Sequence, residues 1–179
     1  MCRSVAIVAC LVVLAVAAPA TTLERLTLDE MTAKSTAIVR GTVLSSYGEA
    51  RGRIIYTHFK VQVSELWKGT SGEQLDVVIP GGTADGLRQT FTGTPKLTTG
   101  GDYVLFLWTG KTGLTHIIGL TQGVFSVASD GKGTLMATRR ATLETMLDRK
   151  TGQVIEDETL RLRLTDLRSR VNTVLLQPK

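Results

Sequence analysis

The sequence has 179 residues, with 21 Lys and Arg against 16 Asp and Glu, a formal charge of +5, and 42% hydrophobic residues. This length predicts a single domain. Acidic residues are interspersed among the basic ones and aromatics are few, whereas nucleic-acid binders usually carry a dense basic stripe with aromatics that stack on bases. Nucleic acid is therefore not an expected partner.

The first twenty residues have the pattern of a secretory signal peptide. Arg3 precedes an apolar run over residues 5–18, and Ala18-Pro19-Ala20 fits a cleavage site before Thr21. The run is shorter than the roughly 20 residues that cross a bilayer. We therefore expect an exported protein, periplasmic or secreted, that touches a membrane only through the uncleaved signal peptide. An uncleaved anchor and a lipobox ending at Cys10 are the alternatives.

Cleavage near Ala20–Thr21 would leave residues 21–179 as the mature domain. Both cysteines, Cys2 and Cys10, precede that point. The mature domain would then have no disulfide, no thiol nucleophile and no thiolate metal site, and its apolar core alone would stabilise it. A cysteine-free exported domain is more typical of a bacterial envelope than of an animal secretory pathway.

A short helix is expected first in the mature chain. Thr27-Leu28-Asp29-Glu30 has the S/T-x-x-E pattern of a capping box, and the helix would end near Ser35. Leu26, which precedes the cap, is placed to pack on Met31.

From Ala37 the apolar period changes from that of a helix to that of a strand. The first two strands are close enough to form a hairpin, and the second has a polar face that includes His58. Gly41, Gly119 and Gly123 interrupt strand-like runs, as glycines do at the corners of a tightly coiled barrel. The expected strands cover residues 37–47, 54–69, 75–80, 100–108, 114–120, 123–129 and 134–139.

The C-terminal part is harder to assign. Residues 141–158 are mixed in composition and predict a loop with a helical turn. Residues 158–164 fit either an edge strand or an extension of the last helix. That helix is expected from about Asp166 to Leu176, with Thr165 as its N-cap.

Short strands, many glycine turns and a helix at each end predict a mainly β protein. The expected fold is a small Greek-key OB-like β-barrel with a short N-terminal helix and a C-terminal amphipathic helix. Trp67 and Trp108 close two of the strands and are expected to plug the barrel ends, with a binding platform as the alternative.

The 81–101 loop is the candidate binding element. It joins two strongly strand-like segments without any apolar rhythm, and polar loops on a rigid barrel are where binding sites usually lie. The alternative is a plain excursion that covers a barrel end, with Leu87 and Phe91 tucked in. The candidate binding residues are Asp85, Arg88, Gln89, Phe91 and Lys96.

No catalytic or metal-binding motif is evident. His58 and His116 do not have metal-ligand spacing, and the sequence contains no G-x-S-x-G nucleophile elbow. We therefore expect no catalytic residue, no metal and no cofactor. The alternative is a hydrolase whose site is assembled from distant residues, with His58 or His116 as the base.

The segments "STAIVRGTVLSSY", "IIYTHFKVQVSELWKG", "GGDYVLFLW" and "HIIGLTQGVFSV" resemble those of exported bacterial proteins with an OB-like barrel. They are also distantly similar to the netrin-like domain of tissue inhibitors of metalloproteinases. That resemblance implies the barrel and, as an alternative function, a protease-inhibitor-like protein. The inhibitors bind the protease metal through an N-terminal cysteine, which a chain beginning near Thr21 lacks. The leading expectation is thus an exported, non-enzymatic binding domain for an envelope or extracellular protein.

Overall fold

The computed structural model describes residues 22–142 and 144–177, so the predicted signal peptide lies outside the described residues. The elements up to the end of β7 are β1 (Thr22–Glu24), α1 (Leu28–Lys34), β2 (Ala37–Arg51), β3 (Ile54–Lys68), β4 (Gln74–Pro80), β5 (Gly82–Ala84), β6 (Leu87–Gln89) and β7 (Asp102–Thr109). They are followed by β8 (Thr115–Ile117), the 3-10 helix η1 (Leu120–Gly123), β9 (Val124–Ser129), β10 (Leu135–Arg139), β11 (Thr145–Leu147), β12 (Val154–Ile155), β13 (Leu160–Arg163) and α2 (Leu164–Leu176).

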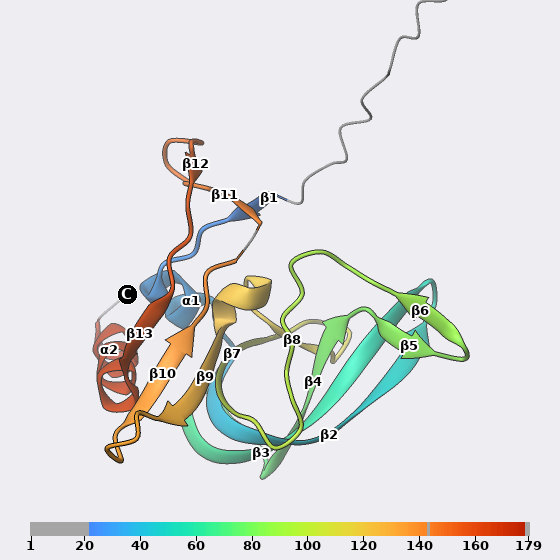
Figure 1. Ribbon diagram of the computed structural model, residues 1–179, viewed down its shortest axis with the longest axis horizontal. Coiled ribbons are helices and arrows are strands. Elements are labelled where there is room, and N and C mark those ends of the chain that lie inside the picture. The colour runs from blue at the N-terminus through green and yellow to red at the C-terminus, as the bar shows by residue number, and fades with distance from the viewer. Residues whose placement is uncertain (1–21, 143, 178–179) are drawn as a thin grey trace, which may run out of the picture.

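Five strands close into a barrel (Figure 1). β2 pairs with β3, β3 with β4, β4 with β8, β8 with β7, and β7 again with β2. Only β4 and β8 are parallel. This Greek-key order is that of an OB fold. The prediction of a mainly β, OB-like barrel with a helix toward each end is therefore confirmed.

The sheet continues beyond the barrel because β7 also pairs with β9. β10 pairs with β9, and β13 pairs with the far side of β10. Of the two possibilities for residues 158–164, an edge strand or an extension of the last helix, the structure shows an edge strand over residues 160–163. α2 begins directly afterwards at Leu164. The prediction that Thr165 is the N-cap is therefore wrong, because Thr165 lies in the first turn and Arg163 is the N-cap. Among the described residues, no helix has the length and apolarity needed to cross a membrane.

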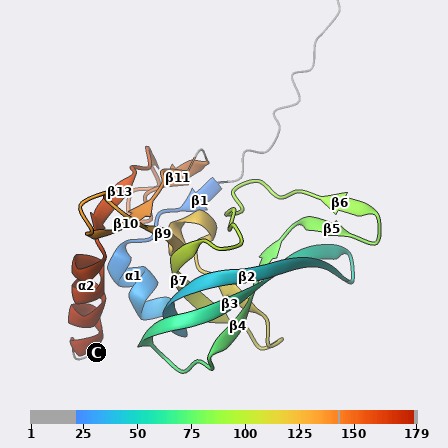
Figure 2. The ribbon, with the colours of Figure 1, turned by 60° about the horizontal axis from the view of Figure 1, so that its bottom comes forward.

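The capping box of α1 is confirmed. The backbone N–H of Glu30 donates to Thr27 Oγ1 at 3.1 Å, and the backbone N–H of Thr27 donates to Glu30 Oε2 at 2.9 Å. Leu26 packs against the same core cluster as Met31. Figure 2 shows α1 and α2 lying side by side against one side of the sheet.

Two apolar cores explain the unbroken apolar run in β7. Tyr103, Leu105 and Leu107 contribute to the core inside the barrel. Val104 and Phe106, which alternate with them, contribute to a second core between the sheet and the helices. Because both faces of β7 are covered, nearly every position along this strand is apolar.

The glycine expectations are partly confirmed. Gly41 lies in β2 at a shift in the register with β3, as a bulge requires. A Cβ at Gly41 would lie 2.5 Å from the carbonyl oxygen of Gln62. Gly119 and Gly123, however, are not inside strands. They flank and end η1, and Gly119 has a φ of +60° that favours glycine.

The prediction of a loop with a helical turn over 141–158 is wrong for the described residues there. β11 and β12 form a hairpin, and β1 pairs in parallel with β11. Figure 1 shows this small three-stranded sheet above the barrel. A parallel pairing between residues 22–24 and 145–147 joins segments far apart in sequence, so local composition gives no sign of it.

Candidate functional site

The 81–101 loop is partly regular. Its first residues form the β5–β6 hairpin, which lies against the end of β2 and the start of β3 (Figure 1). The two layers approach so closely that a Cβ at Gly48 would collide with the carbonyl oxygen of Thr83. Residues 90–101 then cross the barrel mouth without strand or helix.

Several contacts hold the loop to the barrel. The backbone N–H of Ile55 donates to Gln89 Oε1 at 2.8 Å. The backbone N–H of Thr98 donates to the Tyr103 hydroxyl at 3.0 Å. Pro95 is buried, and Leu97 packs against the barrel core. The loop therefore covers the barrel mouth and presents a defined surface.

Leu87 takes no part in this covering, and Phe91 contributes only in part, beside Gly81. The expected alternative had both side chains tucked into the barrel end. Instead Leu87 is 68% exposed and Phe91 is 36% exposed. Exposed apolar side chains on an anchored loop are available for contact with a ligand.

Two adjoining cavities lie beneath the loop. The barrel-mouth cavity has a volume of about 520 Å³ and lies between the loop, the start of β3 and the end of β4. The β9–β10 cavity has a volume of about 390 Å³ and lies between the loop and strands β9 and β10. Pro95, Lys96 and Thr98 line both, so this short segment separates them.

The structure brings four of the five candidate residues together. Arg88, Gln89, Phe91 and Lys96 all line the barrel-mouth cavity. The amide of Gln89 is occupied in holding the loop, so its role is structural at least in part. Asp85 lies in the β5–β6 turn with a φ of +51° and is not part of either lining.

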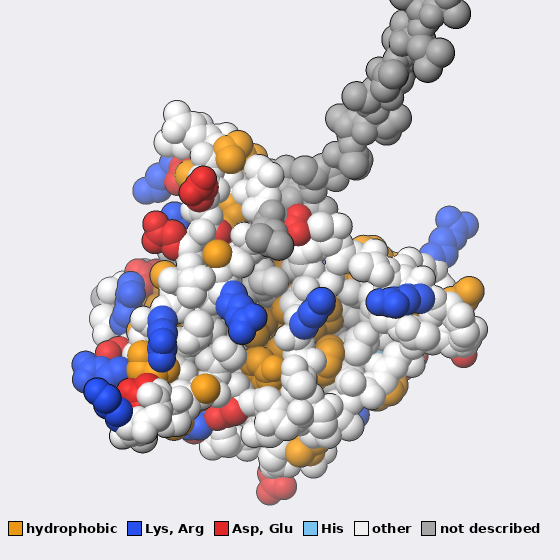
Figure 3. Space-filling view, in the orientation of Figure 1, with side chains coloured by type: hydrophobic (Ala, Val, Ile, Leu, Met, Phe, Trp, Pro, Cys, Tyr) orange, Lys and Arg blue, Asp and Glu red, His pale blue; other side chains and the backbone are white. Residues whose placement is uncertain are grey.

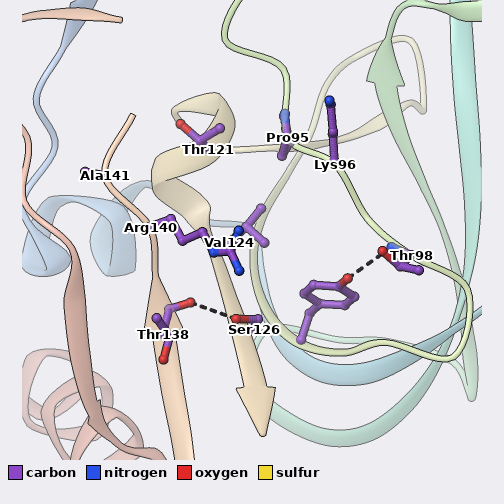
Figure 4. Close-up of a pocket in the computed structure, with 10 residues that line it drawn as sticks. Pro95, Lys96, Thr98, Thr121, Val124, Ser126, Thr138, Arg140 and Ala141 are labelled. Atoms are coloured by element: carbon purple, nitrogen blue, oxygen red, sulfur yellow. Dashed lines mark hydrogen bonds between the residues drawn. The ribbon is translucent and has the colours of Figure 1, made fainter. Parts of the chain in front are cut away.

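Arg140 completes the site and was not predicted. It follows β10 directly, is exposed, and lines the β9–β10 cavity. In Figure 4 the Arg140 side chain extends toward Val124, while Lys96 stands on the loop at the opposite side of the cavity. Ser126 and Thr138 also line this cavity, and the Ser126 hydroxyl donates to the Thr138 carbonyl oxygen at 3.1 Å (Figure 4).

The site is cationic. Within the described part of the chain, Arg88, Lys96 and Arg140 have neither an ion-pair nor a hydrogen-bond partner. Neither cavity is lined by an Asp or Glu. Figure 3 shows basic side chains spread across this face, from β10 to the β5–β6 hairpin, with apolar side chains exposed in the hollow between them. Such a surface attracts anionic groups.

His58 lies elsewhere, on the outer face of the barrel, and is buried. Its Nδ1 lies 3.1 Å from Asp76 Oδ1, and its Nε2 lies 3.6 Å from Glu49 Oε2. The Tyr47 ring stacks on the imidazole with a centroid distance of 4.7 Å. Both ring nitrogens thus face carboxylates, and no Ser or Thr hydroxyl among the described residues bonds to either. This is the geometry of an ion-pair network.

His116 and the tryptophans differ from expectation. Trp108 is 47% exposed and does not plug the barrel. Its ring stacks on the His116 ring, with 6.2 Å between the ring centroids. Burial lowers the pKa of His116. Trp67 is buried, but in the core between sheet and helices, where its indole N–H donates to Glu65.

The ion-pair network around His58 predicts a pH dependence of stability. Burial of the Asp76 carboxyl opposes its charge, but hydrogen bonds from Lys60 and His58 outweigh that effect and hold the pKa of Asp76 below its usual value of 3.8. A carboxyl with a lowered pKa stabilises the fold above its unfolded pKa, and this contribution is lost as the pH falls through the folded value.

We therefore expect the free energy of unfolding of the wild type to fall as the pH drops below about 5, and that of Asp76→Asn to fall less steeply. Urea denaturation at a series of pH values measures this difference. Asp85→Asn, in an exposed turn, is the control and should follow the wild type. Equal slopes for the wild type and Asp76→Asn would show that the network does not hold the carboxyl charged.

No protein-family model, curated protein or solved structure matches this chain. Nor does any group of three or more His, Cys, Asp or Glu among residues 22–142 and 144–177 lie in an arrangement that holds a metal ion. The geometry and charge of the loop face are therefore the basis for inferring a function.

Proposed function

We propose that this protein is an exported, non-enzymatic binding domain. Its binding face consists of the 81–101 loop together with Arg140 and Ala141, and it holds an acidic segment of an envelope or extracellular protein. The observation that carries this proposal is the set of three unpaired cations, Arg88, Lys96 and Arg140, around two cavities without a lining carboxylate. The predicted signal peptide supports the location.

The shape of the site favours a peptide segment. The two cavities adjoin across Lys96, so an extended ligand can place side chains in both. Phe91 and Val124 offer apolar contact beside the cations. Sites for single-stranded nucleic acid usually present a series of aromatic side chains for stacking. Here Phe91 is the one exposed aromatic residue in the two linings.

The alternative functions have less support. A hydrolase with His58 as its base would need a free ring nitrogen next to a nucleophile, and both nitrogens of His58 face carboxylates. A protease-inhibitor-like role depends on an N-terminal cysteine, and the sequence from Thr21 onward has none.

The proposal predicts a loss of affinity on charge reversal. In Lys96→Glu/Arg140→Glu, two carboxylates would face the ligand across the β9–β10 cavity. We expect a short fluorescein-labelled Glu/Leu peptide to bind the wild type at low salt and to bind this variant about tenfold or more weakly, measured by fluorescence anisotropy. Binding to the wild type should weaken as salt is added, because the cations are exposed.

A matched double variant separates site from net charge. Lys111→Glu/Lys132→Glu reverses two exposed lysines in turns that line neither cavity. It should retain wild-type affinity. An equal loss in both variants would mean that only net charge matters, and would contradict a binding site beneath the loop.

A further inference from the structure

A third cavity lies between the two helices and the C-terminal strands. Its volume is about 780 Å³, within the range of pockets that hold small organic ligands. α1, β13, α2 and the turn between β11 and β12 contribute to its lining, and we call it the helix-side cavity. None of its lining residues belongs to the loop site.

The floor of the helix-side cavity is apolar. Met31, Phe125 and Leu167 are fully buried members of the core between sheet and helices. Leu28 and Leu162 pack against the same core and are partly buried. The floor is therefore apolar, and Leu28 and Leu162 are the two of these five residues that keep exposed apolar atoms beside the cavity.

One buried cation also lines this cavity. The side chain of Arg139 is 3% exposed, and its Nη2 donates to Asp157 Oδ1 at 2.6 Å and to the Glu158 carbonyl oxygen at 3.1 Å. Its Nε is buried and has no hydrogen-bond partner among the described residues. A buried donor without an acceptor is costly and rare, so Arg139 Nε is a hydrogen-bond donor that a bound ligand can satisfy.

The rim of the helix-side cavity is cationic. In the described part of the chain, the exposed side chains of Arg25, Lys150, Arg161 and Arg170 have no ion pair or hydrogen bond, although Lys150 lies near enough to Asp148 to help lower its pKa. The lining carboxylates are already engaged: Glu30 caps α1 and lies 3.7 Å from Arg149, and Asp148 accepts hydrogen bonds within its own turn.

We propose that the helix-side cavity binds a small amphiphile with one anionic group and an aliphatic chain, of the fatty-acid type. The anionic group accepts a hydrogen bond from Arg139 Nε. Since Asp157 already balances the charge of Arg139, the rim cations Arg161 and Arg170 supply the positive field that an added anion needs. The aliphatic chain lies on the apolar floor. This site is independent of the proposed loop site.

The direct test is a titration of the full ¹⁵N-labelled protein with sodium decanoate, followed by NMR at the Arg139 Nε–Hε resonance. We expect a saturable shift of this resonance and of the backbone amide of Leu162. Decanol has the same chain without the charge and should bind at least about tenfold more weakly. Binding of decanol as tight as that of decanoate would overturn the proposal.

A titration with decyl phosphate tests whether the ligand's anionic group is a lipid phosphate or the carboxylate of a free fatty acid. Tighter binding of decyl phosphate than of decanoate would support the site and assign it to a phosphate-bearing lipid. Tighter binding of decanoate would assign it to a free fatty acid. No shift with either compound contradicts an anion site at Arg139.

Variants at the rim test the charge without disturbing the buried pair. Arg161→Gln/Arg170→Gln should weaken decanoate binding about tenfold. Arg163→Gln/Arg168→Gln changes two arginines on the same elements, β13 and α2, that lie outside the lining, and should leave binding unchanged. Equal binding by the wild type and both variants would show that the rim cations play no part.

Discussion

Replacing Arg139 with methionine is expected to lower the free energy of unfolding by about 3–5 kcal/mol, because it leaves the carboxylate of Asp157 buried without its partner. Asp157 is 1% exposed at its side chain, and its second oxygen accepts from the backbone N–H of Thr142 at 2.9 Å. The pair joins β10 to the segment before β13. Urea denaturation followed by circular dichroism measures the loss.

The neighbouring residue provides the control for this prediction. Arg140 is exposed and unpaired, so Arg140→Met should change stability by no more than about 0.5 kcal/mol. Arg139→Met/Asp157→Leu removes both charges and should recover part of the loss. If Arg139→Met were as stable as Arg140→Met, the Arg139–Asp157 pair would not hold the segment before β13 to β10.

Gly41→Ala is expected to cost about 1–3 kcal/mol, because there is no space for a side chain at the β2 bulge. The added Cβ would lie 2.5 Å from the Gln62 carbonyl oxygen and 2.7 Å from Val61 Cγ1. Relief would require β2 and β3 to move apart at this bulge. Thermal or urea unfolding measures the effect.

Gly72→Ala is the matched control. Gly72 lies in the turn between β3 and β4, and the nearest atom to an added Cβ is 3.7 Å away. We expect a change within about 0.5 kcal/mol. A neutral Gly41→Ala would contradict the close strand contact at the bulge and weaken the case for a tightly coiled barrel.

Much of the barrel was predictable from short-range patterns. Thr27 and Glu30 mark the start of α1 because a capping box needs only local contacts. The alternation of the first two long strands and the short connection after Arg51 predict the hairpin. The apolar run of β7 indicates a strand covered on both faces.

The alternation of polar and apolar residues along β3 does not predict that His58 is buried. Its position in the strand places it on the polar face of β3, as expected. It is nevertheless buried, because Tyr47 and Glu49 from β2 and Asp76 from β4 surround it. Burial here depends on neighbours in adjacent strands, whose register the sequence alone does not determine.

Arg139 and Arg140 show a signal that was present in the sequence. Arg139 lies two residues after Ala137 in β10, so strand alternation puts it on the same buried face, whereas Arg140 falls outside the strand. This pattern could have indicated a buried arginine. Its partner Asp157, in a segment of mixed composition, could not be predicted from local sequence.

Chemical-shift mapping of the acidic Glu/Leu peptide on the full ¹⁵N-labelled protein shows directly whether the loop face is a binding site. We expect saturable shifts concentrated in residues 88–98 and 138–141, which enclose the two cavities. Shifts confined to the outer face of β2 and β3 around His58, or an absence of saturable shifts, would contradict a binding site on the loop face.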